Sequence, residues 1–188
     1  MGIIRKQSIH NSISLYIGIL IGAVNTILIY PFVFESNPEY WGLLQILVSY
    51  SVIFSSFSHF GGPSIFLRFF PKAQVKSDLF SFTLSLCVIG FLLFVLTFLF
   101  FKDSLLTFIA ATPLLQDYFY WVGVLVFALS FFDLFSSVSS SHLDSSTPVF
   151  LNEVFVRVCV LVLLALYHYE WIIFNQFLLC FIFVYLVK

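Results

Sequence analysis

Charged residues are scarce in this sequence: they make up 9% of its 188 residues, whereas an ordinary soluble domain has about 25%. Hydrophobic residues make up 61%. A soluble fold of this size could not remove so much apolar surface from water, because a large share of its residues lies at the surface. The composition therefore indicates an integral membrane protein, and its long continuous apolar runs favour helices over the alternating strands of a barrel.

The sequence also lacks the motifs of common enzyme classes. It contains no G-x-x-x-x-G-K-[ST] segment for nucleotide phosphates, no H-E-x-x-H zinc motif and no G-x-S-x-G nucleophile turn. Cys87, Cys159 and Cys180 lie inside apolar runs without C-x-x-C spacing, which is typical of small buried side chains. We therefore expect no enzymatic activity, no cofactor, no metal site and no nucleic-acid partner.

Six apolar runs predict an all-α membrane helix bundle with six transmembrane helices and a single membrane domain over residues 1–188. The predicted spans are 13–34, 42–66, 79–101, 118–140, 149–167 and 171–187. A span needs about 20 residues, and the sixth run is short by this measure. The tripeptide Gly61-Gly62-Pro63 predicts a helix break before the loop that follows the second span.

Lysine and arginine are concentrated on one side of these spans. The segments near 35–41, 102–117 and 168–170, which follow the first, third and fifth spans, together hold one basic residue, Lys102. The other seven basic residues lie at the N-terminus and near 67–78, 141–157 (which includes the start of the fifth span) and 188: Arg5, Lys6, Arg68, Lys72, Lys76, Arg157 and Lys188. Because cytoplasmic loops carry the excess of positive charge, both termini are predicted to be cytoplasmic. All three tryptophans, at 41, 121 and 171, lie at the opposite ends of the helices, where amphipathic rings favour the headgroup region.

Polar and small residues form stripes inside the spans. Ser14, Gly18, Gly22 and Asn25 share one face of the first span and include a G-x-x-x-G pattern, which allows another helix to approach closely. Glu153 and Arg157 are one helical turn apart and can pair. Two interpretations of the polar side chains remain open: they pack helices together, or they line an aqueous cavity.

Several motifs, in their order and spacing, resemble one membrane-protein family. They are G-I-I-R-K-Q-S at 2–8, Y-I-G at 16–18 followed by Asn25, Pro31, E-Y-W-G-L-L at 39–44, R-F-F-P at 68–71, and T-P-V-F-L-N-E-V-F-V-R at 147–157. In these features the chain resembles the Wzx-like oligosaccharide flippases of the multidrug/oligosaccharidyl-lipid/polysaccharide exporter superfamily. The resemblance covers nearly the whole chain and corresponds to the N-terminal half of such a protein.

The resemblance implies a multi-pass protein of the bacterial inner membrane. It would move lipid-linked oligosaccharide from the cytoplasmic to the outer leaflet for surface polysaccharide biosynthesis. Family members have two helical lobes that rock against each other around a cavity. We therefore expect membrane lipids and a second lobe as partners; a missing C-terminal half is favoured over a second copy of this chain, because the chain stops abruptly on a short span.

The resemblance also suggests roles for particular residues. Asn25, Gln45 and Asp133 would face the cavity. Arg68 and Arg157 would lie at its cytoplasmic mouth, where a guanidinium suits a pyrophosphate group. Since no nucleotide site is present, energy would come from an ion gradient or from substrate supply, and Asp133 or Glu153 is a candidate to carry a coupling proton.

Two alternatives remain open from the sequence. One is a drug or small-molecule exporter of the same superfamily, which an acidic and aromatic cavity would favour over a basic one. The other is a membrane subunit without transport activity, which would use its G-x-x-x-G face to pack on a partner.

Overall fold

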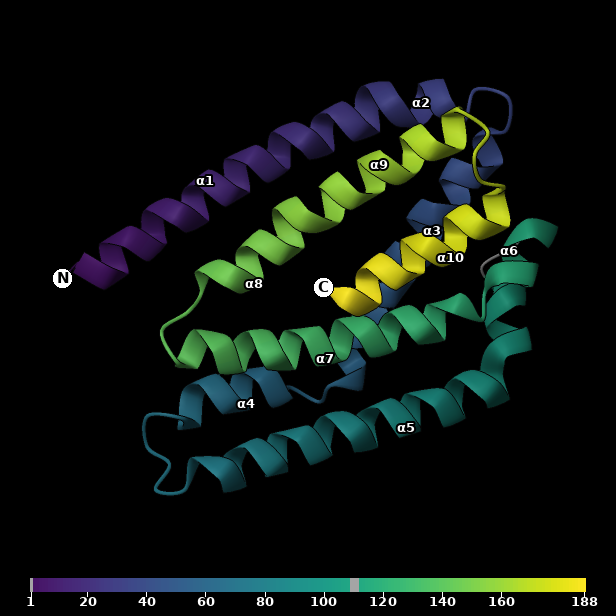
Figure 1. The fold of residues 1–188 in the computed structure, drawn as a ribbon. Coiled ribbons are helices and arrows are strands. Elements are labelled where there is room, and N and C mark those ends of the chain that lie inside the picture. The colour runs from purple at the N-terminus through teal and green to yellow at the C-terminus, as the bar shows by residue number, and fades with distance from the viewer. Residues whose placement is uncertain (1, 109–111) are drawn as a thin grey trace. The chain divides into compact units, whose positions relative to one another are not determined.

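The computed structural model describes residues 2–108 and 112–188, and every regular element in this part of the chain is a helix (Figure 1). In chain order the elements are α1 (Gly2–Val24), the π-helix η1 (Asn25–Ile29), α2 (Tyr30–Val33), α3 (Pro38–Ser58), α4 (Gly62–Phe69), α5 (Lys76–Phe108), α6 (Pro113–Tyr118), α7 (Trp121–Ser141), α8 (Ser146–Phe150), the π-helix η2 (Leu151–Phe155), α9 (Val156–His168) and α10 (Phe174–Val187). The all-helical prediction is confirmed.

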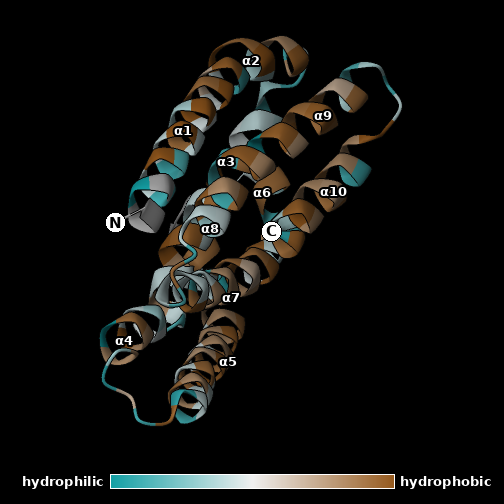
Figure 2. Cartoon of the chain, turned by 60° about the vertical axis from the view of Figure 1, so that its left-hand side comes forward, coloured by the Kyte–Doolittle hydropathy of each residue, from teal (hydrophilic) through white to brown (hydrophobic). Residues whose placement is uncertain are grey.

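Within residues 2–108 and 112–188, five continuous helical stretches are long and apolar enough to cross a membrane. They are Gln7–Val33, Pro38–Ser58, Lys76–Thr107, Trp121–Ser141 and Ser146–His168. In Figure 2 most of the helical residues have the brown colour of hydrophobic residues. The beginning of α1 and the loop between α4 and α5 have the teal colour of hydrophilic residues. The sixth predicted span corresponds to α10, which has 14 residues. It rises about 21 Å, less than the ~30 Å of a hydrocarbon core.

The second predicted span, 42–66, extends past the end of its helix. Helix α3 ends at Ser58, because Phe60 and Gly61 take left-handed backbone angles, with φ of 46° and 71°. The chain then begins α4 at Gly62, with Pro63 in the first turn, where its missing N–H leaves no bond unmade. The break predicted from Gly61-Gly62-Pro63 is therefore present, but a short helix follows it instead of a loop.

The chain divides into two compact units. The first, here the terminal unit, combines the N-terminal residues through Trp41 with Ser139–Lys188. In it, α1 lies beside α8 and η2, and α10 lies beside α9 (Figure 1). A cluster of buried rings joins the ends of these helices: Phe34 contacts both Tyr167 and Phe177, with ring centroids 5.3 and 6.0 Å apart. Ring contacts of this kind contribute about 0.5–1.5 kcal/mol each beyond the burial of their area.

The second, here the central unit, comprises Gly42–Val138. Its core is a series of aromatic contacts in which Phe94 touches Phe54 and Phe98, and Phe119 touches Phe98 and Tyr50. Helix α4 packs along α5. Helices α3 and α5 approach so closely that a Cβ added at Gly90 would overlap the carbonyl oxygen of Ser58; only a glycine fits at this point.

Candidate functional site

One face of α1 packs along α8 and η2 within the terminal unit. The Asn11 Nδ2 donates a hydrogen bond to Ser145 Oγ at 3.0 Å, and the Gln7 amide donates to the carbonyl of Leu143. The predicted small-residue face continues this line: a Cβ added at Gly18 would lie 2.7 Å from the carbonyl oxygen of Glu153. This α1 seam, from Gln7 to Asn25, is thus a packing surface, and the G-x-x-x-G pattern is used inside the chain.

At its far end the α1 seam meets a series of polar contacts that links three helices. Lys188 Nζ donates to Asn152 Oδ1 at 2.8 Å, and Asn152 Nδ2 donates to Glu153 Oε1 at 3.1 Å. Glu153 Oε2 lies 2.9 Å from Arg157 Nη2, and Asn25 Nδ2 donates to the backbone carbonyl of Arg157 at 3.1 Å. We call these five residues the polar chain. The structure therefore brings together three predicted site residues, Asn25, Glu153 and Arg157.

The ion pair lies deep along its helix. Arg157 is midway between Ser146 and His168, the ends of a continuous helical stretch of 23 residues. At 1.5 Å per residue it is roughly 16 Å from either end, which is the middle of a hydrocarbon core if the helix spans it. The resemblance implies that Arg157 lies at the cytoplasmic mouth of a cavity; in the structure Arg157 lies at mid-length of its helical stretch.

A charge at such a depth requires compensation. One arginine at the centre of a spanning helix costs about 2.5–3.5 kcal/mol on insertion scales. Glu153 supplies the opposite charge one turn earlier, and an acidic residue N-terminal to a basic one is the favourable order for such a pair. The side chains of Arg157 and Glu153 keep 33% and 20% of their surface exposed, so the pair is neutral as a unit but still accessible.

Both π-helical segments border the polar chain. Asn25 is the first residue of η1, where its carbonyl accepts from the Tyr30 N–H, and Glu153 is the middle residue of η2. Asn25 is only 4% exposed, and its Oδ1 has no hydrogen-bond partner among the described residues. Single π-helical turns inside α-helices occur frequently at functional sites. Their coincidence with the ion pair marks this part of the terminal unit as the candidate site.

The other predicted site residues belong to the central unit. Gln45 is exposed on α3, and Arg68 is exposed in the last turn of α4. Asp133 is half-buried on α7, and its backbone carbonyl accepts a hydrogen bond from Ser137 Oγ at 2.9 Å. These three residues are therefore not members of the polar chain.

Two members of the polar chain, Asn152 and Lys188, are missing from the sequence-based site. Lys188 is predicted as a loop charge, whereas it lies against Asn152. A signal for this contact exists in the sequence: α9 and α10 form a hairpin about the turn at 169–173, and equal steps away from that turn bring residue 188 level with residue 154, two residues from Asn152. Counting outward from the turn would have found it.

The loop before α8 positions the helix that carries the ion pair. Asp144 accepts hydrogen bonds from the backbone N–H of Thr147 at 3.2 Å and from its hydroxyl at 2.8 Å. These bonds, the side-chain bond first, lower the pKa of Asp144, because they stabilise the ionised carboxylate. The carboxylate therefore satisfies a backbone donor in the first turn of the helix, which has no partner within the helix itself.

Comparison with models of protein families, with curated proteins and with solved structures found no match to this chain. Its function is therefore argued from the geometry of the site together with the motifs of the sequence.

Proposed function

We propose that this protein is one lobe of a membrane transporter without enzymatic activity, which moves lipid-linked oligosaccharide from the cytoplasmic to the outer leaflet of a bacterial inner membrane. The observation that carries the proposal is the Glu153–Arg157 pair at mid-length of an apolar helix. Ionisable residues at this depth are costly and mark substrate or ion pathways. The class of substrate is taken from the resemblance of the sequence motifs.

The chemistry of the pair suits an anionic headgroup. A guanidinium offers five N–H donors in a planar fork that matches phosphate oxygens two at a time, and Glu153 engages one edge of it. A diphosphate reaching Arg157 would replace Glu153 as its counter-ion, so that the arginine stays paired before and after binding. Glu153, released by this exchange, is the proposed carrier of a coupling proton.

The remaining predicted site residues keep their proposed places. Arg68, exposed at the end of α4, is proposed to meet the headgroup at the cytoplasmic mouth, and Gln45 and Asp133 are proposed to line the cavity. Alternating access requires a second lobe against which this one can rock. The alternative of a packing subunit loses its main support, because Gly18 and Gly22 already lie against Glu153 and Arg157 of the same chain.

The test separates the charge of the pair from its contribution to folding. In the cell that makes the protein, Arg157→Gln alone leaves Glu153 without its partner, and we expect both its membrane level and its surface glycan to fall. The double variant Glu153→Gln/Arg157→Gln removes both charges, so its membrane level should recover while surface glycan stays absent. Lys102→Gln, which removes a basic residue elsewhere, is the matched control and should behave as wild type.

Normal surface glycan in the double variant at wild-type membrane level would overturn the proposal. A small-molecule exporter would instead show normal glycan and a changed resistance to toxic compounds. Arg157→Lys adds a finer test: it keeps the charge without the planar fork, so transport should be reduced but not lost.

A further inference from the structure

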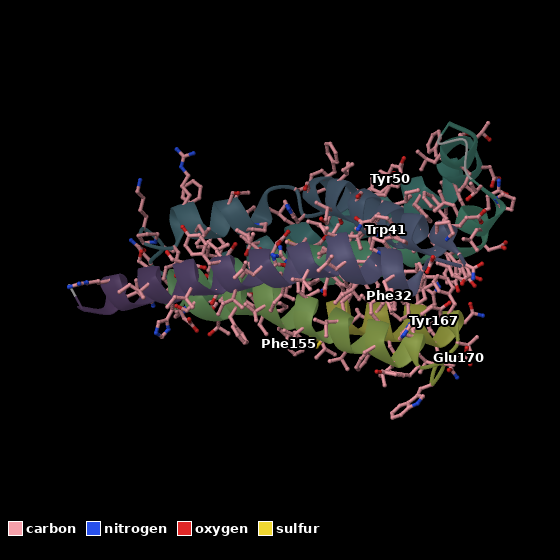
Figure 3. The ribbon with its side chains drawn as sticks, turned by 90° about the horizontal axis from the view of Figure 1, so that it is seen from above. Phe32, Trp41, Tyr50, Phe155, Tyr167 and Glu170 are labelled. Atoms are coloured by element: carbon pink, nitrogen blue, oxygen red, sulfur yellow. The ribbon has the colours of Figure 1, made fainter. Side chains whose placement is uncertain are left out.

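A cavity of about 630 Å³ lies at one end of the terminal unit, where the turn between α2 and α3 meets the turn between α9 and α10. Its size is that of a small-molecule site. Polar and aromatic side chains line it, among them Glu35, Asn37, Tyr40, Tyr167, His168 and Glu170. Figure 3 shows Phe32, Tyr167 and Glu170 gathered at this end, with Phe155 farther along the helices.

The cavity is distinct from the polar chain, because Tyr167 is ten residues from Arg157, about 15 Å along the helix.

The charges that line this cavity are acidic. Glu35 and Glu170 contribute two exposed carboxylates, and none of the residues that line it is a lysine or an arginine. A hollow with one sign of charge and low-dielectric walls concentrates ions of the opposite sign. The cavity is therefore suited to a cation and unsuited to the diphosphate proposed for Arg157.

The walls of the cavity favour an organic cation over a metal ion. Among the described residues, no group of three or more histidine, cysteine, aspartate or glutamate side chains could hold a metal. The aromatic wall includes Tyr40 stacked on Phe174 at 3.8 Å between ring centroids, and Phe32, which is 63% exposed and lies 5.0 Å from the His168 ring. Aromatic faces attract alkylammonium groups through the ring quadrupole.

We propose that this cavity binds a small organic cation of the ammonium class. The carboxylates of Glu35 and Glu170 balance its charge, and the aromatic wall contacts its alkyl groups. The proposal goes beyond the transport function and does not depend on it. The ammonium group could belong to a soluble amine or to the headgroup of a membrane lipid, and the experiment below distinguishes these sources.

The backbone at Glu170 provides an unusually clean variant. The N–H of Trp171 bonds the carbonyl of Leu166, and the N–H of Glu170 bonds that of Tyr167. This pair of bonds is a Schellman motif with Glu170 at the left-handed position, where φ is 59°. Glycine is the residue that this position favours, so Glu170→Gly removes the carboxylate without weakening the turn.

Leu143 provides the matched control. It also has a left-handed backbone, with φ of 64°, and the same two bonds: Asp144 N–H to Ser139 and Leu143 N–H to Ser140. Leu143→Gly therefore makes the same backbone change at a turn that does not line the cavity.

The experiment uses the full chain in nanodiscs of phosphatidylglycerol, with choline as the probe and uncharged 3,3-dimethylbutan-1-ol as its isostere. Isothermal titration should show that choline binds with a Kd at least about tenfold lower than that of the isostere. Glu170→Gly and Glu35→Gln should each weaken choline binding by a similar factor. Leu143→Gly should bind choline as wild type does, and thermal unfolding should show Glu170→Gly at least as stable as wild type.

A second set of nanodiscs contains phosphatidylethanolamine. If this lipid weakens choline binding, its ammonium headgroup occupies the cavity; if binding is unchanged, the ligand is a soluble amine. The proposal is overturned if choline does not bind, if the isostere binds equally well, or if the stable Glu170→Gly variant still binds choline with wild-type affinity.

Discussion

Arg157 and Glu153 differ from most charged side chains of this chain in their depth. Arg5, Arg68, Lys72 and Lys76 are exposed near helix ends or in a loop, whereas the pair lies at mid-length of Ser146–His168. At a helix end an arginine can extend its side chain to the interface and needs no partner. At mid-length it needs a counter-ion on the same or a neighbouring helix, and Glu153 meets this need with one salt bridge.

Asp144 gives a prediction at the same scale. Its pKa is lowered in the folded protein, so the ionised carboxylate stabilises the fold. This contribution is fully present above the pKa of an unfolded aspartate, about 3.9, and is lost as the pH falls through the lower folded value. We expect Asp144→Ala to be less stable at pH 7 by about 0.5–1 kcal/mol, the usual effect of removing a helix cap, with little of the difference left near the folded pKa.

The measurement is thermal unfolding in detergent over a series of pH values. Thr147→Val removes the hydroxyl that bonds the same carboxylate and should show part of the same pH dependence. A constant difference between Asp144→Ala and wild type at every pH would show that the carboxylate acts by some means other than its charge.

Helix periodicity was enough to predict the α1 seam but not its partner. The projection at 100° per residue places Gly18, Gly22 and Asn25 on one face, and in the structure each of them meets Glu153 or Arg157. Which helix covers a face is not encoded in that face's own spacing. The packing of this face of α1 therefore depends on contacts with residues more than 100 positions away along the chain.

Helix ends were harder to predict, for two different reasons. The second span was placed too far along because α4 continues the apolar pattern, with buried Phe66, after the break at His59–Gly61. Hydropathy does not register a change of backbone direction. The π-helical segments, η1 and η2, follow from backbone hydrogen bonds, for which the sequence has no specific signal apart from the polar residues that they contain.

The two glycines of the α1 seam should respond differently to alanine. At Gly18 the added Cβ would lie 2.7 Å from the carbonyl oxygen of Glu153, which is backbone and cannot give way. At Gly22 it would lie 2.9 Å from Arg157 Nη1, the far end of a flexible side chain. We expect Gly18→Ala to destabilise the protein by about 1–3 kcal/mol, as overpacking usually does, and Gly22→Ala to have a smaller effect on stability.

Thermal unfolding in detergent measures both variants. Gly123→Ala is the control, because among the described residues no atom beyond its own stretch of helix lies within 4 Å of its added Cβ. Because alanine favours a helix more than glycine does, Gly123→Ala should be at least as stable as wild type. If Gly18→Ala changes the stability as Gly123→Ala does, helix propensity, and not the contact with Glu153, sets the effect.

At the scale of the whole molecule, the structure changes the number of basic residues counted in the loops on each side of the membrane. Arg157 lies at mid-length of a helical stretch and against Gly22 of α1, and Lys188 lies against Asn152 of η2, so they no longer count as loop charges. The bias falls from seven against one to five against one: Arg5, Lys6, Arg68, Lys72 and Lys76 on one side, and Lys102 on the other. The rule that cytoplasmic loops are positive still predicts a cytoplasmic N-terminus. The contact of Asn11 with Ser145 adds that the loop before α8 lies at the same end of the terminal unit as the beginning of α1.

This orientation leads to the last prediction, which single-cysteine labelling can test. With Cys87, Cys159 and Cys180 replaced by serine or alanine, a new cysteine at Gln74, in the loop between α4 and α5, should be cytoplasmic. A new cysteine at Asn37, in the turn between α2 and α3, should be on the outside. A membrane-impermeant maleimide added to intact cells should therefore label Asn37→Cys alone, and both sites should react after permeabilisation.

The two sites lie on opposite sides of a single spanning helix, because α3, Pro38–Ser58, separates them. A cysteine at Leu92, in the middle of the Lys76–Thr107 stretch and 55% exposed in the protein, should react in neither preparation, because bilayer lipid would cover it. Labelling of Gln74→Cys alone in intact cells would invert the orientation, and with it the direction proposed for transport. Labelling of both loop sites in intact cells would mean that α3 does not cross the membrane. In that case the turn between α2 and α3 and the loop between α4 and α5 would face the same compartment, and the alternation of sides that the charge bias predicts would have to be abandoned.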